Sequence, residues 1–393
     1  MLTSHRRLRN IGKGLKGSTD LAGAVDHLTI TLQYGAVHTT TGVRGIVRDG
    51  SGSLTVEARD VGNALITGPI SGTVSVAILN DPQTSGAAAT LGGTTSGTWS
   101  AGVKAFTGLT INKENTTTMT LRVTWGSKTV DCTAFCVYHP VFDTAPYTDA
   151  DRKYGACCLN TVGPNGLRTC VPDGTTPTLV ETFNDPLSAT ISWTQPTDAN
   201  CVTLPAWNAA CVFGTDDFYT GDAEAVTASN YAGDTVYMLS VADIVDRGST
   251  SPAFILETRT GANGFWFGFL QDGSANETLG NNDARAGVNA QGWYDHNIAE
   301  GTPAYCAVLM PRNSVSTLRV GANTGAGTGT SSDSAKPTNM DECTLCGRVG
   351  GSLYFGADAS SPNLWSIDVY SASKESSATA WRSALGTALG LSL

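Results

Sequence analysis

The chain is a succession of short segments in which apolar and polar residues alternate, separated by turns rich in Gly, Asn and Ser. Residues 27–32, His-Leu-Thr-Ile-Thr-Leu, are apolar at every second position, the pattern of a strand with one buried face. The 45 glycines follow no three-residue period, so a collagen-like repeat is excluded. With 40% hydrophobic and 15% charged residues, the chain has enough apolar surface to form a core. We therefore predict an all-β protein of many short strands.

Residues 27–140 contain a dense run of such segments. Two of them, 45–48 and 53–58, flank the turn signal Asp-Gly-Ser-Gly at 49–52, which predicts a β-hairpin. Six or seven short strands in about 110 residues favour a small β-sandwich with an immunoglobulin-like arrangement. The likeness is one of pattern only, because the tryptophan between two cysteines that marks immunoglobulin domains is absent. The other expected strands are 27–32, 73–79, 119–125 and 129–138.

Residues 141–178 differ from what precedes them. Cys157, Cys158 and Cys170 lie here among Gly, Pro and Asn, and apolar residues show little periodicity. We interpret 141–178 as a Cys-rich linker. The alternative is a small irregular subdomain that packs on one of its neighbours.

The remainder, residues 179–393, again alternates, and its end is distinctive. A glycine-flanked segment at 351–356 leads to 364–371, Leu-Trp-Ser-Ile-Asp-Val-Tyr-Ser, and then to a Ser- and Ala-rich stretch at 374–389. This order resembles the end of concanavalin A-like lectin and laminin-G-type jelly rolls. The resemblance implies a jelly-roll sandwich over 179–393 with a short C-terminal helix, and the alternation agrees with two packed sheets. Further segments that resemble strands of this family are 179–185, 234–241, 254–257 and 264–269.

Positive charge is concentrated at the N-terminus. Residues 1–16 contain no acidic side chain, whereas the whole chain has 34 acidic and 24 basic residues and a net charge of −10. An acidic body repels phosphates, so nucleic acid is disfavoured as a partner. No apolar stretch follows the basic residues, which predicts that a cleaved export signal is absent. We interpret residues 1–26 as an anchoring arm, the alternative being a solvated terminus; its basic residues are Arg6, Arg7, Arg9, Lys13 and Lys16.

Cysteine usage predicts disulfides, because an even number of cysteines lies largely in a Gly- and Pro-rich region. On one strand Cys132 and Cys136 would be about 13 Å apart, too far to pair with each other. Cys343 and Cys346 have the spacing of half a zinc site, but no second pair supplies the other ligands, so no metal is expected. The disulfide candidates are Cys132, Cys136, Cys157, Cys158, Cys170, Cys201, Cys211, Cys306, Cys343 and Cys346.

Catalytic patterns are missing. Glycan hydrolysis needs two carboxylates on one face of a cleft, but Asp216–Asp217 and Asp341–Glu342 are adjacent pairs that would lie on opposite faces of a strand. The chain has no nucleophile elbow, P-loop or H-E-x-x-H motif. Its five histidines are scattered, which leaves a Cys/His dyad open. We expect no enzymatic activity.

Two segments combine aromatic, amide and carboxylate groups, which are the groups that hold sugars. They are 281–283, Asn-Asn-Asp, and 291–297, Gln-Gly-Trp-Tyr-Asp-His-Asn, and both are expected on loops. The alternative is that the aromatic residues pack at the sandwich edge and the polar ones cap turns. Ca²⁺ suits this chemistry, but nothing in the sequence supports it, and no cofactor is expected. The candidate glycan-binding residues are Asn281, Asn282, Asp283, Trp293, Tyr294, Asp295 and Asn297.

Two further predictions concern burial and loop structure in the C-terminal part. At least one of Trp266 and Phe267 is expected in the core, because both lie in an apolar run. Residues 321–334, rich in Gly, Thr and Ser, are expected to form a long flexible loop.

Together these features predict a non-enzymatic structural protein of a virus particle, of the tailed-phage tail, neck or fibre appendage type. It would be made in the host cytoplasm and located in the extracellular particle. Its expected partners are other virion proteins, further copies of itself and a host-surface glycan, and no apolar run approaches the roughly 20 residues of a membrane span. The alternatives are a secreted or cell-surface adhesin and, third, a glycan hydrolase.

Overall fold

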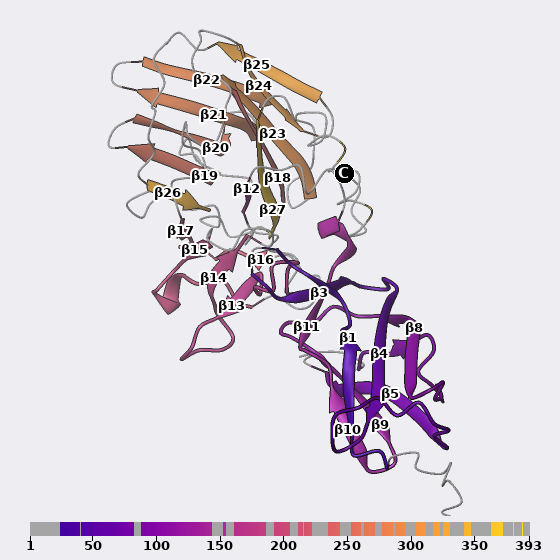
Figure 1. Cartoon of the computed structure of the whole chain (residues 1–393). Helices are drawn as coiled ribbons and strands as arrows, with labels where there is room; N and C mark the ends of the chain where they lie inside the picture. Colours follow the sequence, from indigo (N-terminus) through magenta and orange to yellow (C-terminus); the bar gives the residue numbers. More distant parts are fainter. Residues whose placement is uncertain are drawn as a thin grey trace, which may run out of the picture.

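The structure is a computed structural model (Figure 1). It describes the N-terminal part almost continuously and the C-terminal part mainly as the backbone of its strands. The expectation of an all-β chain is confirmed within these residues. The described residues are 24–39, 41–81, 88–143, 152–154, 161–185, 192–204, 211–214, 216–221, 235–243, 253–260, 263–271, 277–285, 288–295, 303–311, 317–322, 325–330, 342–346, 363–371, 380 and 387.

The N-terminal part contains three small sheets. The first has the order β1 (His27–Leu32), β4 (Gly52–Arg59), β8 (Val103–Ile111) and β6 (Leu91–Gly92). The second has the order β10 (Lys128–Asp131), β9 (Thr120–Trp125), β5 (Thr73–Asn80) and β7 (Ser96–Thr98). In the third, β3 (Arg44–Val47) lies between β2 (Ala36–Val37) and the parallel strand β11 (Phe135–Tyr138), and the 3-10 helix η1 (Pro140–Asp143) follows.

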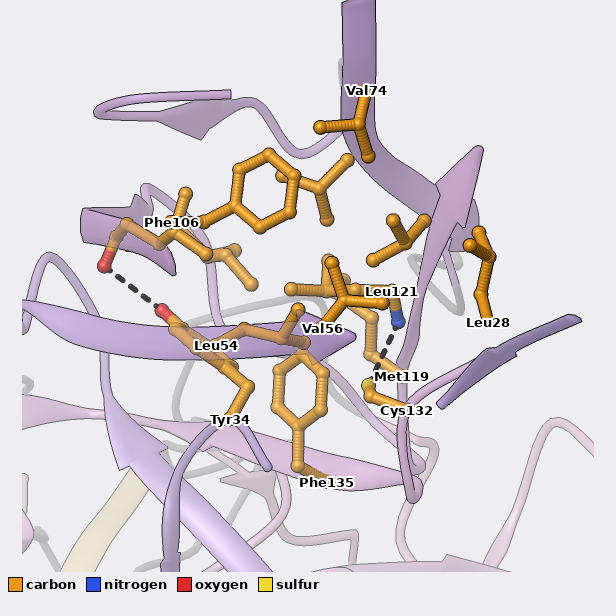
Figure 2. Close-up of a cluster of buried hydrophobic side chains, with 14 of the residues drawn as sticks. Leu28, Tyr34, Leu54, Val56, Val74, Phe106, Met119, Leu121, Cys132 and Phe135 are labelled. Carbon is orange, nitrogen blue, oxygen red and sulfur yellow. Dashed lines mark hydrogen bonds between the residues drawn. The ribbon is translucent and has the colours of Figure 1, made fainter. Parts of the chain in front are cut away.

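One hydrophobic core joins these sheets (Figure 2). Strand β4 shows how alternation builds it, since Leu54, Val56 and Ala58 are buried and the residues between them are only partly covered. The phenol of Tyr34 donates to the carbonyl of Leu109 at 3.1 Å, and its ring packs edge-on against Phe135 at 4.8 Å. The described strands of the N-terminal part therefore pack as small sheets around one shared core. Other core residues are Leu28, Val74, Val76, Phe106, Ile111, Met119, Leu121, Val123 and Val137.

The hairpin predicted around residues 49–52 does not form. Strand β3 pairs with β2 and β11, whereas β4 pairs with β1 and β8, so the turn carries the chain from one sheet to another. Asp49 adopts a left-handed φ of 60°, and its amide donates to the carbonyl of Ile111 rather than across a hairpin. A side chain at Gly52 would collide with the Tyr34 ring, so the core contact determines the direction of the chain here.

A charged cluster is buried beside β11. Arg48 donates to Glu114 at 2.6 Å, and the Glu114 side chain is 2% exposed. The Nε2 atom of His139, which is also buried, lies 3.7 Å from the same carboxylate oxygen. Burial, together with the charge of Arg48, lowers the pKa of His139 to about 4. His139 is thus neutral at neutral pH.

Residues 161–170 form a tight turn that is hydrogen-bonded to the N-terminal sandwich. The amide of Val162 and the hydroxyl of Thr161 both donate to the carbonyl of Asn115, at 2.9 and 3.0 Å. Asn115 is itself fully buried, and its Oδ1 accepts from the amide of Val137 at 2.9 Å. Gly166 has a φ of +81°, and a Cβ there would lie 2.7 Å from Val43, so the turn is closely packed on the sandwich.

The same turn is bonded to the C-terminal part. Asn165, fully buried, donates to the carbonyl of Asp185 at 2.9 Å, and the amide of Asn184 donates to the carbonyl of Thr169 at 2.9 Å. Within the predicted linker, β12 (Arg152–Tyr154) and β13 (Cys170–Pro172) pair with strands of the C-terminal sheet. These described pieces of 141–178 are therefore packed structure that joins the two parts.

The C-terminal part is one antiparallel sheet of sixteen described strands. One end runs β12, β27 (Asn363–Ser371), β18 (Thr235–Asp243), β23 (Pro303–Pro311), β24 (Thr317–Ala322) and β25 (Gly325–Thr330). It continues through β22 (Val288–Asp295), β21 (Glu277–Arg285), β20 (Asn263–Gln271), β19 (Ala253–Thr260) and β26 (Glu342–Leu345). The other end is β17 (Tyr219–Gly221), β15 (Ser192–Thr194), β14 (Val180–Asn184) and β13, while β16 (Cys211–Val212) pairs with β27 and η2 (Asp198–Asn200) is a 3-10 turn.

This sheet bends into two layers. Strands β26, β19, β20, β21 and β22 are stacked in order on one side, and β18, β23 and β24 lie on the other (Figure 1). Strand β21 also approaches β23 and β24, with which it shares no ladder. The described strands of the C-terminal part thus form an antiparallel, two-layered β-structure.

Two local expectations have different outcomes. The loop predicted at 321–334 is wrong for its described residues up to 330, because they pair as the hairpin β24–β25, in which Ala322 is opposite Gly325. Of the helix predicted at 374–389, only Ala380 and Thr387 are described, and both are helical. Within the described residues, no helix is long and apolar enough to cross a membrane.

The buried His139 predicts a pH dependence. Its pKa is lower in the folded chain than the ordinary 6.5, so its contribution to stability is complete above pH 6.5 and is lost as the pH falls towards 4. We expect up to about 3 kcal/mol of unfolding free energy to be lost over this window. Urea unfolding at a series of pH values measures it. His139→Gln should have a shallower slope, and equal slopes for both proteins would contradict this assignment.

Candidate binding face on the C-terminal sheet

The sequence-predicted glycan-binding residues lie in two paired strands and not on loops. Asn281, Asn282 and Asp283 belong to β21, and Trp293 and Tyr294 belong to β22. Both are inner strands, since β20 flanks one and β25 the other. The prediction of loops is therefore wrong, because ladder pairing outweighs the turn preference of Asn and Asp here. Asp295 ends β22, and Asn297 lies outside the described residues.

The register separates these residues onto two faces. In an antiparallel ladder, directly opposed residues share a face and successive residues alternate between faces. Asn282 is opposite Gln291, and Trp293 is opposite Gly280, so Asn282 and Trp293 share one face. Asp283 is opposite Ala290 and therefore lies on the other face. By the same rule Asp295 joins Trp293, whereas Asn281 and Tyr294 join Asp283.

Described side chains identify the buried face. Phe183 pairs with Trp193, Trp193 with Gly221, and all three lie in one cross-strand row. Phe183 and Trp193 are fully buried, and a Cβ at Gly221 would collide with the Trp193 ring. The row then continues through paired residues as Cys343, Thr258, Phe265, Asp283 and Ala290. We call this side of the sheet the buried face.

Tyr219 strengthens this assignment. It is paired with Leu345 on the same face, and both are fully buried. The Tyr219 hydroxyl donates to the carbonyl of Val180 at 2.7 Å and accepts from the amide of Val202 at 3.0 Å. Burial raises the pKa of this phenol far above its ordinary range. Such a fully satisfied polar group in the core fixes the register at this end of the sheet.

The opposite side, which we call the outward face, begins with exposed threonines. Thr194 and Thr220 are paired neighbours, and both are exposed. Thr220 pairs with Thr344, which starts an unbroken row across the sheet. The row continues as Glu257, Trp266, Asn282, Gln291 and Thr330.

The outward face thus carries a tryptophan between a carboxylate residue and an amide residue. Trp266 is opposite Glu257 on one side and Asn282 on the other. Trp293 belongs to the next row, in which Phe254, Gly268, Gly280 and Trp293 are paired in turn. With strands about 4.8 Å apart and about 3.3 Å per residue, the two tryptophan backbones are roughly 12 Å apart. Gly268, Gly280 and Asn282 occupy the positions between them.

Charged residues on this face are also paired across strands. Arg259 is opposite Glu342, and Glu257 is two residues along the same strand from Arg259. These pairs place Glu257, Arg259 and Glu342 together on one face of two adjacent strands.

The cysteines differ from the expectation of disulfides. Cys132, Cys136 and Cys201 are buried free thiols. The thiol of Cys136 donates to the carbonyl of Gly163 at 3.5 Å, and burial raises its pKa to about 12. Burial likewise raises the pKa of Cys201 to about 11. Each sulfur is enclosed among protein atoms and is not opposite another cysteine.

The remaining predicted residues are other cysteines and the basic residues of the N-terminal arm. Cys170, Cys211 and Cys346 are buried, and Cys306 and Cys343 lie in β23 and β26. The arm residues Arg6, Arg7, Arg9, Lys13 and Lys16, and also Cys157 and Cys158, lie outside the described residues. Among the described residues, no group of three or more His, Cys, Asp or Glu side chains could hold a metal ion.

Sequence reasoning missed Trp266 as a site residue, although its signal is present. In 263–271, Phe265, Phe267 and Phe269 alternate with Gly264, Trp266 and Gly268. Read with a period of two, this run separates three phenylalanines from the tryptophan. Glu257 and Asn282 could not be found in this way, because they reach Trp266 only through strand pairing.

Comparisons with known proteins give distant similarities. No protein-family model and no curated protein matches the chain. Among solved structures it is similar to the receptor binding domain of botulinum neurotoxin mosaic serotype C/D, at 8% identity and a TM-score of 0.34 over 45% of this chain and 42% of that chain. It is similar to Trypanosoma rangeli sialidase in complex with sialic acid, at 11% identity and a TM-score of 0.37 over 86% and 52%.

A third similarity is to mouse laminin alpha1 chain domains LG4-5, at 9% identity and a TM-score of 0.29 over 76% of this chain and 80% of that chain. The chain spans 42% of the length of the botulinum neurotoxin C/D chain, and 39% of the length of a similar chain, the binding domain of botulinum neurotoxin DC.

Proposed function

We propose that the C-terminal jelly roll binds glycans through the outward face of β19–β22, without turning them over. The observation that carries this proposal is the row in which Trp266 lies between Glu257 and Asn282, with Trp293 in the next row. Indole rings stack on sugar faces, and amides and carboxylates bond the hydroxyl groups. The proposal keeps Trp293, Asp295 and Asn282 from the sequence-based set and adds Trp266, Glu257 and Gln291. It excludes Asn281, Asp283 and Tyr294 from direct contact with ligand.

Absence of turnover is part of the same proposal. It is supported by the sequence, which contains no nucleophile elbow, P-loop or H-E-x-x-H motif. A glycan hydrolase remains the alternative, and release of reducing ends from a bound polysaccharide would favour it.

We further propose that the chain is a structural component of a virus particle of the tailed-phage appendage type, assembled with other virion proteins and with copies of itself. The support is the segregation of basic residues in the N-terminal arm of an otherwise acidic chain. An immunoglobulin-like arrangement of the N-terminal sandwich fits such a spacer, since β1, β4 and β8 share one sheet and β5, β9 and β10 the other. Fixed stoichiometry in purified particles tests this, and recovery only from cell surfaces would favour the adhesin alternative.

Replacing both tryptophans tests the glycan proposal. Trp266→Ala and Trp293→Ala should each weaken binding to those members of an oligosaccharide array that the native chain binds by roughly two- to tenfold, because each removes one stacking surface. Thermal unfolding should change little, since neither residue belongs to the buried face. Val61→Ala, at a residue 88% exposed in the N-terminal sandwich, is the matched control. Binding by the double variant equal to that of the native chain, per folded molecule, would refute the proposal.

A further inference from the structure

The spacing of the two tryptophans on the outward face restricts the shape of a ligand. Trp266 and Trp293 lie two strands apart and one cross-strand row apart, which places their backbones roughly 12 Å from each other. A single sugar ring is too small to touch both residues. A ligand that uses both must extend diagonally across β20, β21 and β22.

Two of the residues between the tryptophans are glycines, which have no side chain, and the third is Asn282. Gly268 of β20 is opposite Gly280 of β21, and Gly280 is opposite Trp293. Glycine inside a strand weakens the strand and often marks a place where another molecule approaches the backbone closely. Two paired glycines beside Trp293 therefore leave part of the backbone between the tryptophans uncovered by side chains.

The hydrogen-bonding residues lie along this same diagonal. Asn282 is opposite Trp266, and Gln291 is two residues from Trp293 in the same strand. Asp295 is two residues from Trp293 on its other side and shares the same face. Amide and carboxylate groups thus accompany the whole length of the path and are not gathered at one point.

The charge of this face restricts the ligand further. The outward face of β19, β22 and β26 includes Glu257, Asp295 and Glu342, with Arg259 opposite Glu342, and Arg319 lies on the same face of β24. The whole chain also carries a net charge of −10. Like charges repel at a surface with this balance, so a glycan that carries carboxylates or sulfates is disfavoured.

We infer that the ligand of this face is an extended, uncharged oligosaccharide of several sugar units, with one unit on Trp266 and another on Trp293. This inference rests on the glycan-binding function proposed above and specifies its ligand class. It predicts that affinity depends on chain length, because only a chain that spans both tryptophans gains both stacking contacts.

The test uses the full chain and an array of linear neutral oligosaccharides from monosaccharides to octasaccharides, printed beside sialylated and sulfated oligosaccharides of the same lengths. We expect binding to neutral chains to rise by about two- to tenfold once the chain reaches both tryptophans, and no comparable binding to the acidic series. Trp266→Ala and Trp293→Ala should each remove the increase with length, whereas Val61→Ala should leave it unchanged. Val61→Ala again serves as control.

The outcomes that contradict the inference are distinct. Preference for the sialylated or sulfated series, or affinity for neutral chains that does not change with length, would refute the ligand class while leaving glycan binding intact. Failure of every printed oligosaccharide to bind would refute the proposed function itself, and this inference with it.

Discussion

The account of the C-terminal part depends on one constraint, the strict alternation of faces along antiparallel strands. Once Trp193 and Tyr219 are buried, the pairing from β14 to β22 assigns the paired residues to one side or the other of the sheet. A shift of one residue would exchange the two faces. The Tyr219 hydroxyl, which bonds to the backbone at Val180 and Val202, opposes such a shift because it would lose both partners in the core. The residues that lie on the candidate binding face are therefore determined by which residues are buried in the core.

A second set of buried polar bonds joins the two parts of the chain. Asn115 and Asn165 are both fully buried, and they hold the turn at 161–170 against the sandwich on one side and β14 on the other. Buried amides whose partners are removed cost about 1–3 kcal/mol each, so this joint resists opening. Together with the pair Arg48–Glu114 close by, it gives the molecule a polar junction rather than a flexible linker.

Alternation along single strands could be predicted from the sequence, and it gave most strand positions correctly: 27–32 matches β1, and 364–371 lies within β27. Pairing between strands could not. The turn at 49–52 has the residues of a hairpin, yet the contact between Gly52 and Tyr34 directs the chain into another sheet. The candidate site was found in part for the same reason. Trp293 is close to polar residues in the sequence itself, such as Gln291 and Asp295. Trp266 lies next to Glu257 and Asn282 only because the strands pair.

Oxidative footprinting tests the central claim most directly, because it compares tryptophans within one native molecule. The intact chain is exposed to hydroxyl radicals, and the oxidation of each tryptophan is quantified by mass spectrometry of its peptides. Trp193, which is fully buried, serves as the internal standard for protection. If Trp266 and Trp293 lie on the outward face, both should be oxidised many times faster than Trp193, and unfolding should abolish the difference. Protection of Trp266 equal to that of Trp193 would place it in the core and contradict the account.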